Sequence, residues 1–464
     1  MISKDRLKEI ILSNKEFILN QVDVVIKREA FRLPQDVNKV VVLYGVRRSG
    51  KTFILYGLFR KRSEESLYID FEDERLADFR LEDFEILREA FLELNPHLVN
   101  KGRVFLFDEV QNVPGWEKFC RRVAEREKTQ VYVSGSSSKI MPEEIHTSLR
   151  GRAWSVEITP FSFREYLKAV NAVLDRDSLY GQKKVLLKKH FNDYLRWGGF
   201  PEIAFSGNEF DKNKIIKEYL GSIFFKDLVE RYKINNISLL DAMIECLFAF
   251  FSQKFSLNSF YRQHKDKISF SKDSLFSYYK HFLQSMLIFE VRKFTESPYK
   301  RLRNPAKIYL IDPALAKKMS SQDSGRILEN IVFLELRKRA DKISYFEDGC
   351  ECDFIVNDGQ KFLAYQSCYE LTPENERREL DGLAACCKQL KLKRGVIVTL
   401  DQSDEVVKDG VKIEIVPVWR WLLTRGNLIL EKSLLKSRGM LKGVSTNALI
   451  RERRSLRKQE HSGE

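Results

Sequence analysis

One segment near the N-terminus constrains the fold more than any other part of the chain. Residues 40–43 form a continuous apolar run that is rich in β-branched side chains and too short for a helix, so they predict a buried parallel strand. A glycine-rich loop follows Tyr44, fits the pattern GxxxxGK[ST] at every fixed position and opens an amphipathic helical pattern. Strand, loop and helix in this order predict a phosphate-binding loop. Its residues are Gly45, Val46, Arg47, Arg48, Ser49, Gly50, Lys51 and Thr52.

The residue types of this loop indicate its ligand. Glycines let backbone N–H groups curl around phosphate oxygens, and the N-terminus of the following helix adds a favourable dipole. Lys51 is placed to reach the β- and γ-phosphates of ATP, and the hydroxyl of Thr52 is a hard oxygen ligand suited to Mg²⁺. The sequence therefore predicts ATP and Mg²⁺ as cofactors.

An acidic pair predicts the second half of the same site. The apolar run at residues 104–107 ends at Asp108 and Glu109, which is typical of a Walker B strand. We expect Asp108 to hold Mg²⁺ through water and Glu109 to orient and deprotonate the attacking water. A strand at residues 67–71 and a helix stand between the loop and this pair, which favours the additional-strand, catalytic-glutamate class of P-loop ATPases. The alternative is a strand that merely turns at two acidic residues.

A further strand, at residues 130–133, runs into a cluster of small hydroxyl side chains. Ser134 and Ser136 lie where this strand ends. Because ligands of open α/β sheets bind at the carboxyl edge of the strands, either serine is a candidate sensor of the γ-phosphate beside the attacking water. The alternative is a plain polar turn.

Five segments in fixed order resemble one known family. They read GVRRSGKT, FLFDEVQNVPGWE, SGSSSKI, LRGR and PFSFREYL, and the series is similar to that of a large family of uncharacterised prokaryotic ATPases in the AAA+ superfamily. The resemblance covers nearly the whole chain after about residue 20 and implies an ATPase domain followed by a region with a restriction-endonuclease-like domain. It also implies that Arg150 or Arg152 contacts the γ-phosphate as an arginine finger, in cis or from a neighbouring subunit of a homo-oligomer. The alternative is that both are surface arginines that end a helix.

The middle of the chain predicts a connector and a winged-helix-like unit. Residues 166–206 are helical with an aromatic turn, which is typical of a lid or connector. Residues 207–319 contain helices and then two strands, whose loop carries Lys300, Arg301 and Arg303. That order resembles a winged helix. In this interpretation a helix enters the DNA major groove and the loop contacts phosphates. The alternative is that the unit serves for packing or for protein contact. The candidate groove-facing residues are Lys272, Ser277, Lys280 and His281.

Residues 320–425 follow the element order of a restriction-endonuclease-like domain, in which a helix acid, a strand aspartate and an E-x-K motif assemble a Mg²⁺ site. Glu329 and Asp353 fit the first two positions. Gln366 and Cys368 stand at the third, where a neutral amide and a thiol replace a carboxylate and a lysine. Lys361 lies an odd number of residues before Gln366 and so on the opposite face of its strand. We therefore expect the fold to persist with most or all cleavage activity lost.

Length and composition limit the remaining possibilities. At about 150 residues per domain, a chain of 464 residues suggests roughly three units, of which the ATPase domain at 36–165 is the first. We expect an N-terminal helical segment at 1–35 before it and a disordered basic tail at 426–464. A net charge of +14 favours a polyanionic partner such as DNA, while solvated basic faces are the alternative. The sequence lacks the roughly 20-residue apolar run of a membrane helix and any secretory signal pattern, so we expect a cytoplasmic protein that does not contact membranes.

Three functional hypotheses follow for this α/β protein. The first is an Mg²⁺-dependent AAA+-type ATPase that couples ATP hydrolysis to a conformational change, with DNA as a candidate partner. The second is a nucleotide-switched nuclease of a defence or mobile-element system. The third is an ATP-regulated protein-binding regulator that contacts no nucleic acid. DNA binding separates the third from the others, and metal-dependent cleavage separates the second from the first.

Overall fold

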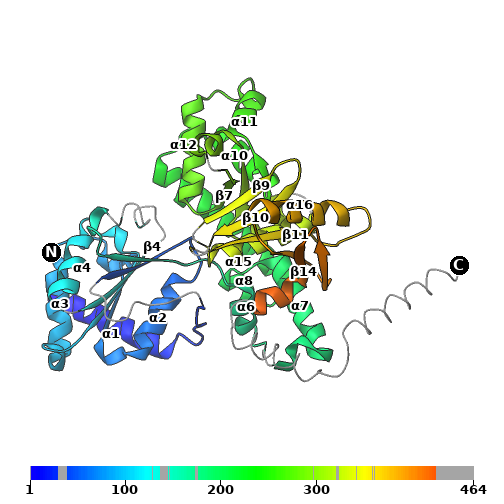
Figure 1. Ribbon diagram of the computed structural model, residues 1–464. Coiled ribbons are helices and arrows are strands. Elements are labelled where there is room, and N and C mark those ends of the chain that lie inside the picture. Colours follow the sequence, from blue (N-terminus) through cyan, green and yellow to red (C-terminus); the bar gives the residue numbers. More distant parts are fainter. Residues whose placement is uncertain are drawn as a thin grey trace.

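The computed structural model describes residues 2–29, 39–127, 129–135, 140, 145, 147–172, 176–295, 297–319, 323–340, 342–357, 359 and 361–424. Ser136 and the basic tail at 426–464 lie outside these described residues. Figure 1 shows an N-terminal α/β unit on one side and a larger sheet with its own helices on the other. No helix among the described residues is long and apolar enough to cross a membrane.

The N-terminal unit is built on a parallel sheet. Over the described residues this sheet has five strands in the order β2-β3-β4-β1-β5, and every pair is parallel. Strand β4 separates β1, which leads into the glycine-rich loop, from β3, which ends in the acidic pair. The prediction of a parallel-sheet P-loop ATPase unit within an α/β protein is therefore confirmed. The strands are β1 (Val40–Tyr44), β2 (Ser66–Asp70), β3 (Val104–Asp108), β4 (Gln130–Gly135) and β5 (Ala153–Glu157).

Helices cover both faces of this sheet because side chains alternate along each strand. Val40 and Val42 belong to a core shared with α3 and α4, whereas Val41 and Leu43 pack with α2 on the opposite face. Helix α1 contributes to both cores through its two ends. The helices are α1 (Lys4–Asn20), α2 (Lys51–Lys61), α3 (Asp83–Leu94) and α4 (Trp116–Arg126).

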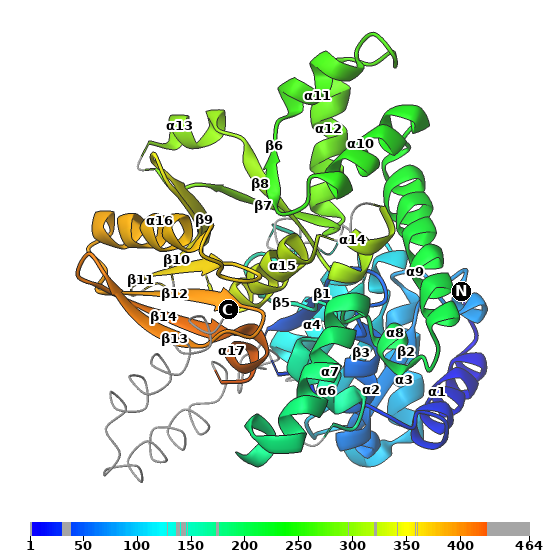
Figure 2. The ribbon, with the colours of Figure 1, turned by 90° about the vertical axis from the view of Figure 1, so that its right-hand side faces the viewer.

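A group of helices follows the ATPase unit. Helix α14 packs against α7, α9, α10 and α15, and Figure 2 shows it between α9 and α15. It therefore connects the helices beside the ATPase unit with those on the second sheet. The helices of this group are α6 (Phe163–Ala169), α7 (Gly181–Trp197), α8 (Pro201–Phe205), α9 (Glu209–Ser222), the π-helix η7 (Ile223–Glu230), α10 (Ile237–Ala249), α11 (Leu257–His264), α12 (Lys272–Gln284) and α14 (Pro313–Met319).

The second sheet is mixed and spans the middle and the C-terminal part of the chain. In the part of the chain that the structure describes, it has nine strands in the order β13-β14-β12-β11-β10-β9-β7-β8-β6. Helix α16 (Glu376–Gln389) packs on one face of its C-terminal strands, and α15 (Ser324–Arg337) and α17 (Val418–Thr424) pack on the other. The strands are β6 (Gln253–Phe255), β7 (Ile288–Lys293), β8 (Ala306–Leu310), β9 (Lys342–Glu347), β10 (Glu351–Asn357), β11 (Phe362–Ser367), β12 (Arg394–Thr399), β13 (Asp404–Lys408) and β14 (Val411–Pro417).

From the sequence we expect one unit to end at residue 319 and another to begin at residue 320, but strands from both sides of this boundary belong to the same sheet. The order α10, β6, α11, α12, β7, β8 suits a winged-helix-like unit, but β7 also pairs in parallel with β9, at Arg292↔Ser344 and Lys293↔Tyr345. The loop between β7 and β8 contains the short helix α13 (Pro298–Arg303) instead of a simple extended wing. Local periodicity in the sequence predicts where β7 and β9 lie, but not that they pair. The pairing of strands far apart in sequence is set by tertiary packing. The winged-helix interpretation stays a prediction.

A close approach between the connector and α14 makes Gly198 a sensitive position. Gly198 has φ of 72°, and a Cβ atom there would lie 1.7 Å from Oδ1 of Asp312. The Asp312 carboxylate is buried and accepts hydrogen bonds from the backbone N–H groups of Gly199 and Ala314, both at 2.8 Å. This carboxylate therefore fixes the end of α7 to the start of α14.

We expect Gly198→Ala to lower the free energy of unfolding by about 3 kcal/mol or more, because it combines a strained backbone with a steric clash. Urea denaturation of the purified protein measures the change. Gly207→Ala is the matched control, since a Cβ atom there meets nothing within 4 Å. Equal stability losses in the two variants would contradict the role of the close approach.

Candidate functional site

The glycine-rich loop has the backbone that its sequence predicts. Gly45 has φ of 153°, and a Cβ atom there would lie 2.1 Å from the carbonyl oxygen of Ile158. Gly50, with φ of 92°, is the N-cap of α2, so Lys51 and Thr52 begin that helix. The hydroxyl of Ser49 is buried and has no hydrogen-bond partner among the described residues. A loop with a helix N-terminus and an unpartnered buried hydroxyl suits a bound triphosphate.

Lys51 lies buried beneath this loop. Its Nζ donates hydrogen bonds to the carbonyl oxygens of Gly45 and Val46, both at 3.1 Å. Burial lowers the pKa of Lys51 below its ordinary value, while the charges of Glu109 and Asp108 act in the opposite direction. The ammonium group is thus held at the loop by carbonyl oxygens, which are weaker partners than phosphate oxygens.

The acidic pair lies beside the loop as the sequence predicts. Asp108 is buried, and it accepts hydrogen bonds from the hydroxyls of Ser134 and Tyr68, the latter at 3.3 Å, while the nearby Thr52 hydroxyl acts to lower its pKa. Burial raises the pKa of Asp108 above its ordinary value, and the neighbouring Glu109 adds to this. Thr52 and Asp108, the two expected metal ligands, are therefore adjacent, and Ser134 positions Asp108.

Glu109 is held in an uncommon conformation by a residue that the sequence analysis missed. Glu109 has φ of 46°, and its Oε2 accepts a hydrogen bond from Nε2 of Gln111. Gln111 in turn lies against Gly135 at the end of β4, where a Cβ atom would come within 2.1 Å of the Gln111 amide oxygen. The lack of a side chain at Gly135 therefore leaves room for the residue that orients the candidate catalytic base. No local pattern in the sequence marks this role of Gln111.

Both arginines of the loop contact helices outside the ATPase unit. Arg47 forms ion pairs with Asp227 of η7 at 3.5 Å and with Glu72 at 3.7 Å. Arg48 forms an ion pair with Glu202 of α8 at 3.4 Å. Burial raises the pKa of Asp227 above its ordinary value, and Arg47 acts against this. Asp227 was also missed, because nothing in the sequence of η7 links this acid to the glycine-rich loop.

A cavity of about 1030 Å³ opens at the loop and is large enough for a nucleotide. Arg47, Arg48, Lys51 and Thr52 line it together with Glu109. The opposite wall comes from α8, α9 and η7, which place two lysines and several apolar side chains in it. These opposing residues are Phe205, Lys214, Ile215, Tyr219 and Lys226.

The structure does not bring the two candidate arginine fingers to this cavity. Arg150 and Arg152 are exposed, and neither lines the cavity. Arg152 forms an ion pair with Glu125 of α4. Contact with a phosphate in cis is therefore not supported, and contact from a neighbouring subunit stays a prediction. Ser136 cannot be placed, because it lies outside the described residues.

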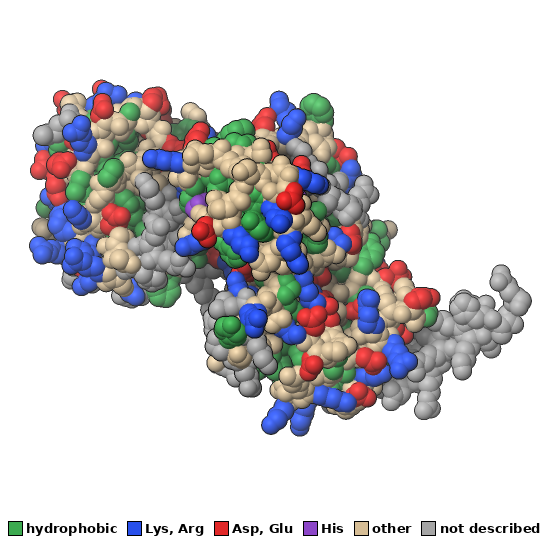
Figure 3. Space-filling view, turned by 90° about the horizontal axis from the view of Figure 1, so that it is seen from above, with side chains coloured by type: hydrophobic (Ala, Val, Ile, Leu, Met, Phe, Trp, Pro, Cys, Tyr) green, Lys and Arg blue, Asp and Glu red, His purple; other side chains and the backbone are tan. Residues whose placement is uncertain are grey.

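The expected DNA-facing residues are only partly available at the surface. Lys272, Ser277 and Lys280 are exposed on α12, but the ring of His281 stacks on Tyr232 with ring centroids 3.7 Å apart. In the loop, Arg301 donates a hydrogen bond to the backbone oxygen of Thr295. Figure 3 shows Lys and Arg side chains interspersed with Asp and Glu over the face in view. DNA contact therefore stays a prediction.

The nuclease-like residues come together with a partner that was not predicted. Glu329 on α15 and Asp353 on β10 both contact Nζ of Lys307 on β8, at 3.3 and 2.9 Å. Gln366 lies behind Asp353, whereas the thiol of Cys368 donates a hydrogen bond to the backbone oxygen of Glu370. Burial raises the pKa of Cys368 to about 11. A lysine from another strand, Lys307, therefore lies between the two carboxylates that were expected to bind metal.

Three stretches of the chain match known domain families. Residues 37–167 match the AAA domain, residues 188–326 match a domain of unknown function (DUF8612), and residues 324–421 match another domain of unknown function (DUF4143). The first stretch contains the five parallel strands, the glycine-rich loop and the acidic pair. The second and third meet at the start of α15.

Relatives with similar sequences extend over most of the chain. An uncharacterized protein of Methanocaldococcus jannaschii is 36% identical over 440 residues, which are 91% of this chain and 97% of that protein. An uncharacterized protein of Haemophilus influenzae is 27% identical over 402 residues, which are 84% of this chain and 95% of that protein. Among solved structures, a Walker-type ATPase of Pyrococcus abyssi aligns with 14% identity and a TM-score of 0.39, over 68% of this chain and 95% of that chain.

Proposed function

The chain belongs to an uncharacterised family of AAA+ ATPases, and on that premise we propose that it binds ATP and hydrolyses it with Mg²⁺ in the cavity at the glycine-rich loop. We further propose that ATP turnover changes how the helices after residue 200 pack on the ATPase unit. We place this activity in the cytoplasm.

One observation carries the first part of the proposal. The buried Lys51, the adjacent Thr52 and Asp108 side chains and Glu109 meet at the carboxyl edge of a single parallel sheet, beside one cavity of about 1030 Å³. Open α/β sheets bind their ligands at this edge. The loop glycines leave backbone N–H groups accessible to phosphate oxygens, and the start of α2 adds its dipole.

Each side chain then has a defined task. Thr52 and Asp108 offer hard oxygens to Mg²⁺, which supplies charge neutralisation at the β- and γ-phosphates when it is bound. Lys51 exchanges its carbonyl partners for phosphate oxygens. Glu109, oriented by Gln111, accepts a proton from the attacking water. Ser134 holds Asp108 in place through its hydroxyl.

The loop arginines support the second part of the proposal. Arg47 and Arg48 belong to the loop that surrounds the phosphates, yet their ion-pair partners Asp227 and Glu202 lie on η7 and α8. A triphosphate draws arginines toward itself, because Arg–phosphate pairs are charge-assisted and bidentate. Binding and hydrolysis therefore change these ion pairs, and through α9 and α14 the change reaches the second sheet.

A neighbouring copy of this chain is our candidate source of an arginine finger. Arg150 and Arg152 are exposed and lie away from the cavity of their own chain. An arginine supplied in trans stabilises the charge that develops during phosphoryl transfer. DNA is kept as a candidate partner on the net charge of +14 alone.

One prediction concerns the two steps of ATP turnover. We expect Lys51→Ala to raise the Kd for ATP at least about tenfold, because it removes the cation that faces the phosphates. Glu109→Gln keeps the shape of the site but loses the base, so we expect it to retain ATP while kcat falls about 100-fold or more. Titration calorimetry measures the affinity, and phosphate release measures the turnover.

Lys61→Ala is the matched control for the affinity, since Lys61 is exposed at the other end of the same helix. Absence of ATP binding by the wild-type protein at several Mg²⁺ concentrations would contradict the proposal.

Another prediction concerns the proposed coupling. In the Glu109→Gln protein, we expect ATP and Mg²⁺ to speed amide hydrogen exchange within residues 201–230, because the triphosphate draws Arg47 and Arg48 away from Asp227 and Glu202. Asp227→Asn, added to that protein, removes the ion-pair partner of Arg47 in advance and is expected to abolish most of this ATP-dependent increase. Asp241→Asn, an exposed aspartate on α10, is the matched control. A change in exchange confined to residues 45–52 and 108–112 would refute coupling to these helices while leaving ATP binding intact.

A further inference from the structure

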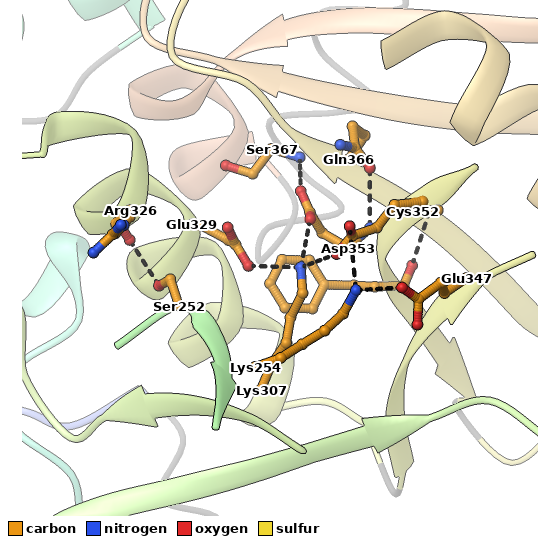
Figure 4. Close-up of polar contacts among 12 residues, drawn as sticks. Ser252, Lys254, Lys307, Arg326, Glu329, Glu347, Cys352, Asp353, Gln366 and Ser367 are labelled. Atoms are coloured by element: carbon orange, nitrogen blue, oxygen red, sulfur yellow. Dashed lines mark hydrogen bonds and ion pairs between the residues drawn. The ribbon is translucent and has the colours of Figure 1, made fainter. Parts of the chain in front are cut away.

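The nuclease-like carboxylates of this chain surround a lysine. Lys307 is the second residue of β8, and its Nζ lies 2.9 Å from Oδ1 of Asp353, 3.0 Å from Oε1 of Glu351 and 3.3 Å from Oε1 of Glu329. Figure 4 shows the ammonium group pointing into the space between the helix acid and the strand acid. These are the two groups that would hold Mg²⁺ in a nuclease of this fold.

This contact is buried and well satisfied. The side chains of Lys307, Asp353 and Glu329 are 5%, 8% and 14% exposed. The hydroxyl of Tyr309 donates a hydrogen bond of 2.7 Å to Glu329, and the backbone N–H of Ser367 donates one of 2.9 Å to Asp353. Burying an ammonium group or a carboxylate without a partner costs several kcal/mol, so each of these charges depends on the others.

The pKa shifts of Lys307 and Glu329 agree with the mutual dependence of these buried charges. Burial alone lowers the pKa of Lys307, but the charges of Asp353 and Glu329 outweigh it and hold the pKa well above its ordinary value. Burial and the charge of Asp353 raise the pKa of Glu329 to about 7. Lys307 therefore stays cationic at neutral pH.

Gln366, at the third expected metal-binding position, is also engaged in hydrogen bonds within the protein. The amide oxygen of Gln366 accepts a hydrogen bond of 2.9 Å from the backbone N–H of Asp353, and its Nε2 donates one of 2.6 Å to Glu379. Gln366 is therefore committed to Asp353 and Glu379. Among the described residues, no group of three or more His, Cys, Asp or Glu is arranged to hold a metal ion. Mg²⁺ needs oxygen ligands at about 2.1 Å in near-octahedral order, and a fixed ammonium group in their midst repels it.

The location of the cluster indicates what the lysine does instead. Strands β7 and β9 join the two parts of the sheet at Arg292↔Ser344 and Lys293↔Tyr345, which is a short seam. Lys254 on β6 stands directly opposite Lys307 on β8. Like charges in that position repel each other unless acids neutralise them. Lys254 contacts Glu347 of β9 at 2.6 Å and Glu351 of β10 at 3.5 Å, so both lysines reach across the seam.

We propose that the ammonium group of Lys307 takes the place of the divalent cation in the nuclease-like site, and that the site is a metal-independent charge junction that fixes β8 to α15 and β10. Asp353 and Glu329 then neutralise Lys307 and hold no metal, which leaves the domain without a cleavage centre. This inference does not depend on ATP turnover, and its failure would leave the proposed ATPase activity untouched.

Manganese binding tests the inference directly. The full-length protein, free of nucleotide and treated with chelator, is titrated with Mn²⁺ and followed by electron paramagnetic resonance. Wild type and Asp353→Asn are expected to bind the same number of ions. Lys307→Met is expected to bind one additional Mn²⁺ per chain, because it removes the ammonium group that lies between the carboxylates and repels a cation. That gain should disappear in Lys307→Met/Asp353→Asn.

Lys342→Met, an exposed lysine at the start of β9, is the matched control and should gain no ion. Circular dichroism verifies that each variant is folded. A Mn²⁺ site in the wild type that is lost in Asp353→Asn would overturn the inference, and so would a folded Lys307→Met protein that gains none.

If Lys307→Met unfolds without metal, Mn²⁺ should restore its thermal transition, and failure to do so counts against the inference. Cleavage of linear, nicked or branched DNA by the wild type in Mg²⁺ or Mn²⁺ that disappears in Asp353→Ala would also overturn it.

Discussion

Parallel pairing of β1, β4 and β3 is the constraint on which the rest of the ATPase site depends. It brings the carboxyl ends of all three strands to one edge, so the loop after β1, Ser134 at the end of β4 and Asp108 at the end of β3 become neighbours. Residues far apart in sequence thus share hydrogen bonds around Asp108. Without this register Lys51 would be a buried cation with carbonyl partners alone, which is a costly arrangement.

The same edge is where the ATPase unit contacts the rest of the molecule. Arg47 and Arg48 place two charges of the loop against Asp227 and Glu202, which belong to helices that follow the ATPase unit. A ligand that attracts those arginines must compete with the helices for them. The ligand then binds more tightly when the arginines are released from the helices than when they are paired with them. A ligand can drive a conformational change only through such a difference in binding free energy between two arrangements.

Local patterns predicted the features that depend on local chemistry. The strand at residues 40–43, the loop at 45–52 and the acids at 108 and 109 were visible because strand, turn and helix signals follow one another directly. Gln111 was missed because no local pattern marks its contact with Glu109, and Asp227 was missed because its partner Arg47 comes from another element. Lys307 was missed for the same reason, although its spacing from Tyr309 places both on one face of β8, where both contact Glu329. The pairing of β7 with β9 is likewise non-local.

The most direct test of the central claim is a crystal structure of the Glu109→Gln protein grown with ATP and Mg²⁺. The account predicts a triphosphate within the loop at residues 45–52, Thr52 beside the metal, and Nζ of Lys51 moved from the carbonyl oxygens of Gly45 and Val46 to the phosphates. A nucleotide bound elsewhere, with Lys51 still on those carbonyl oxygens, would contradict it.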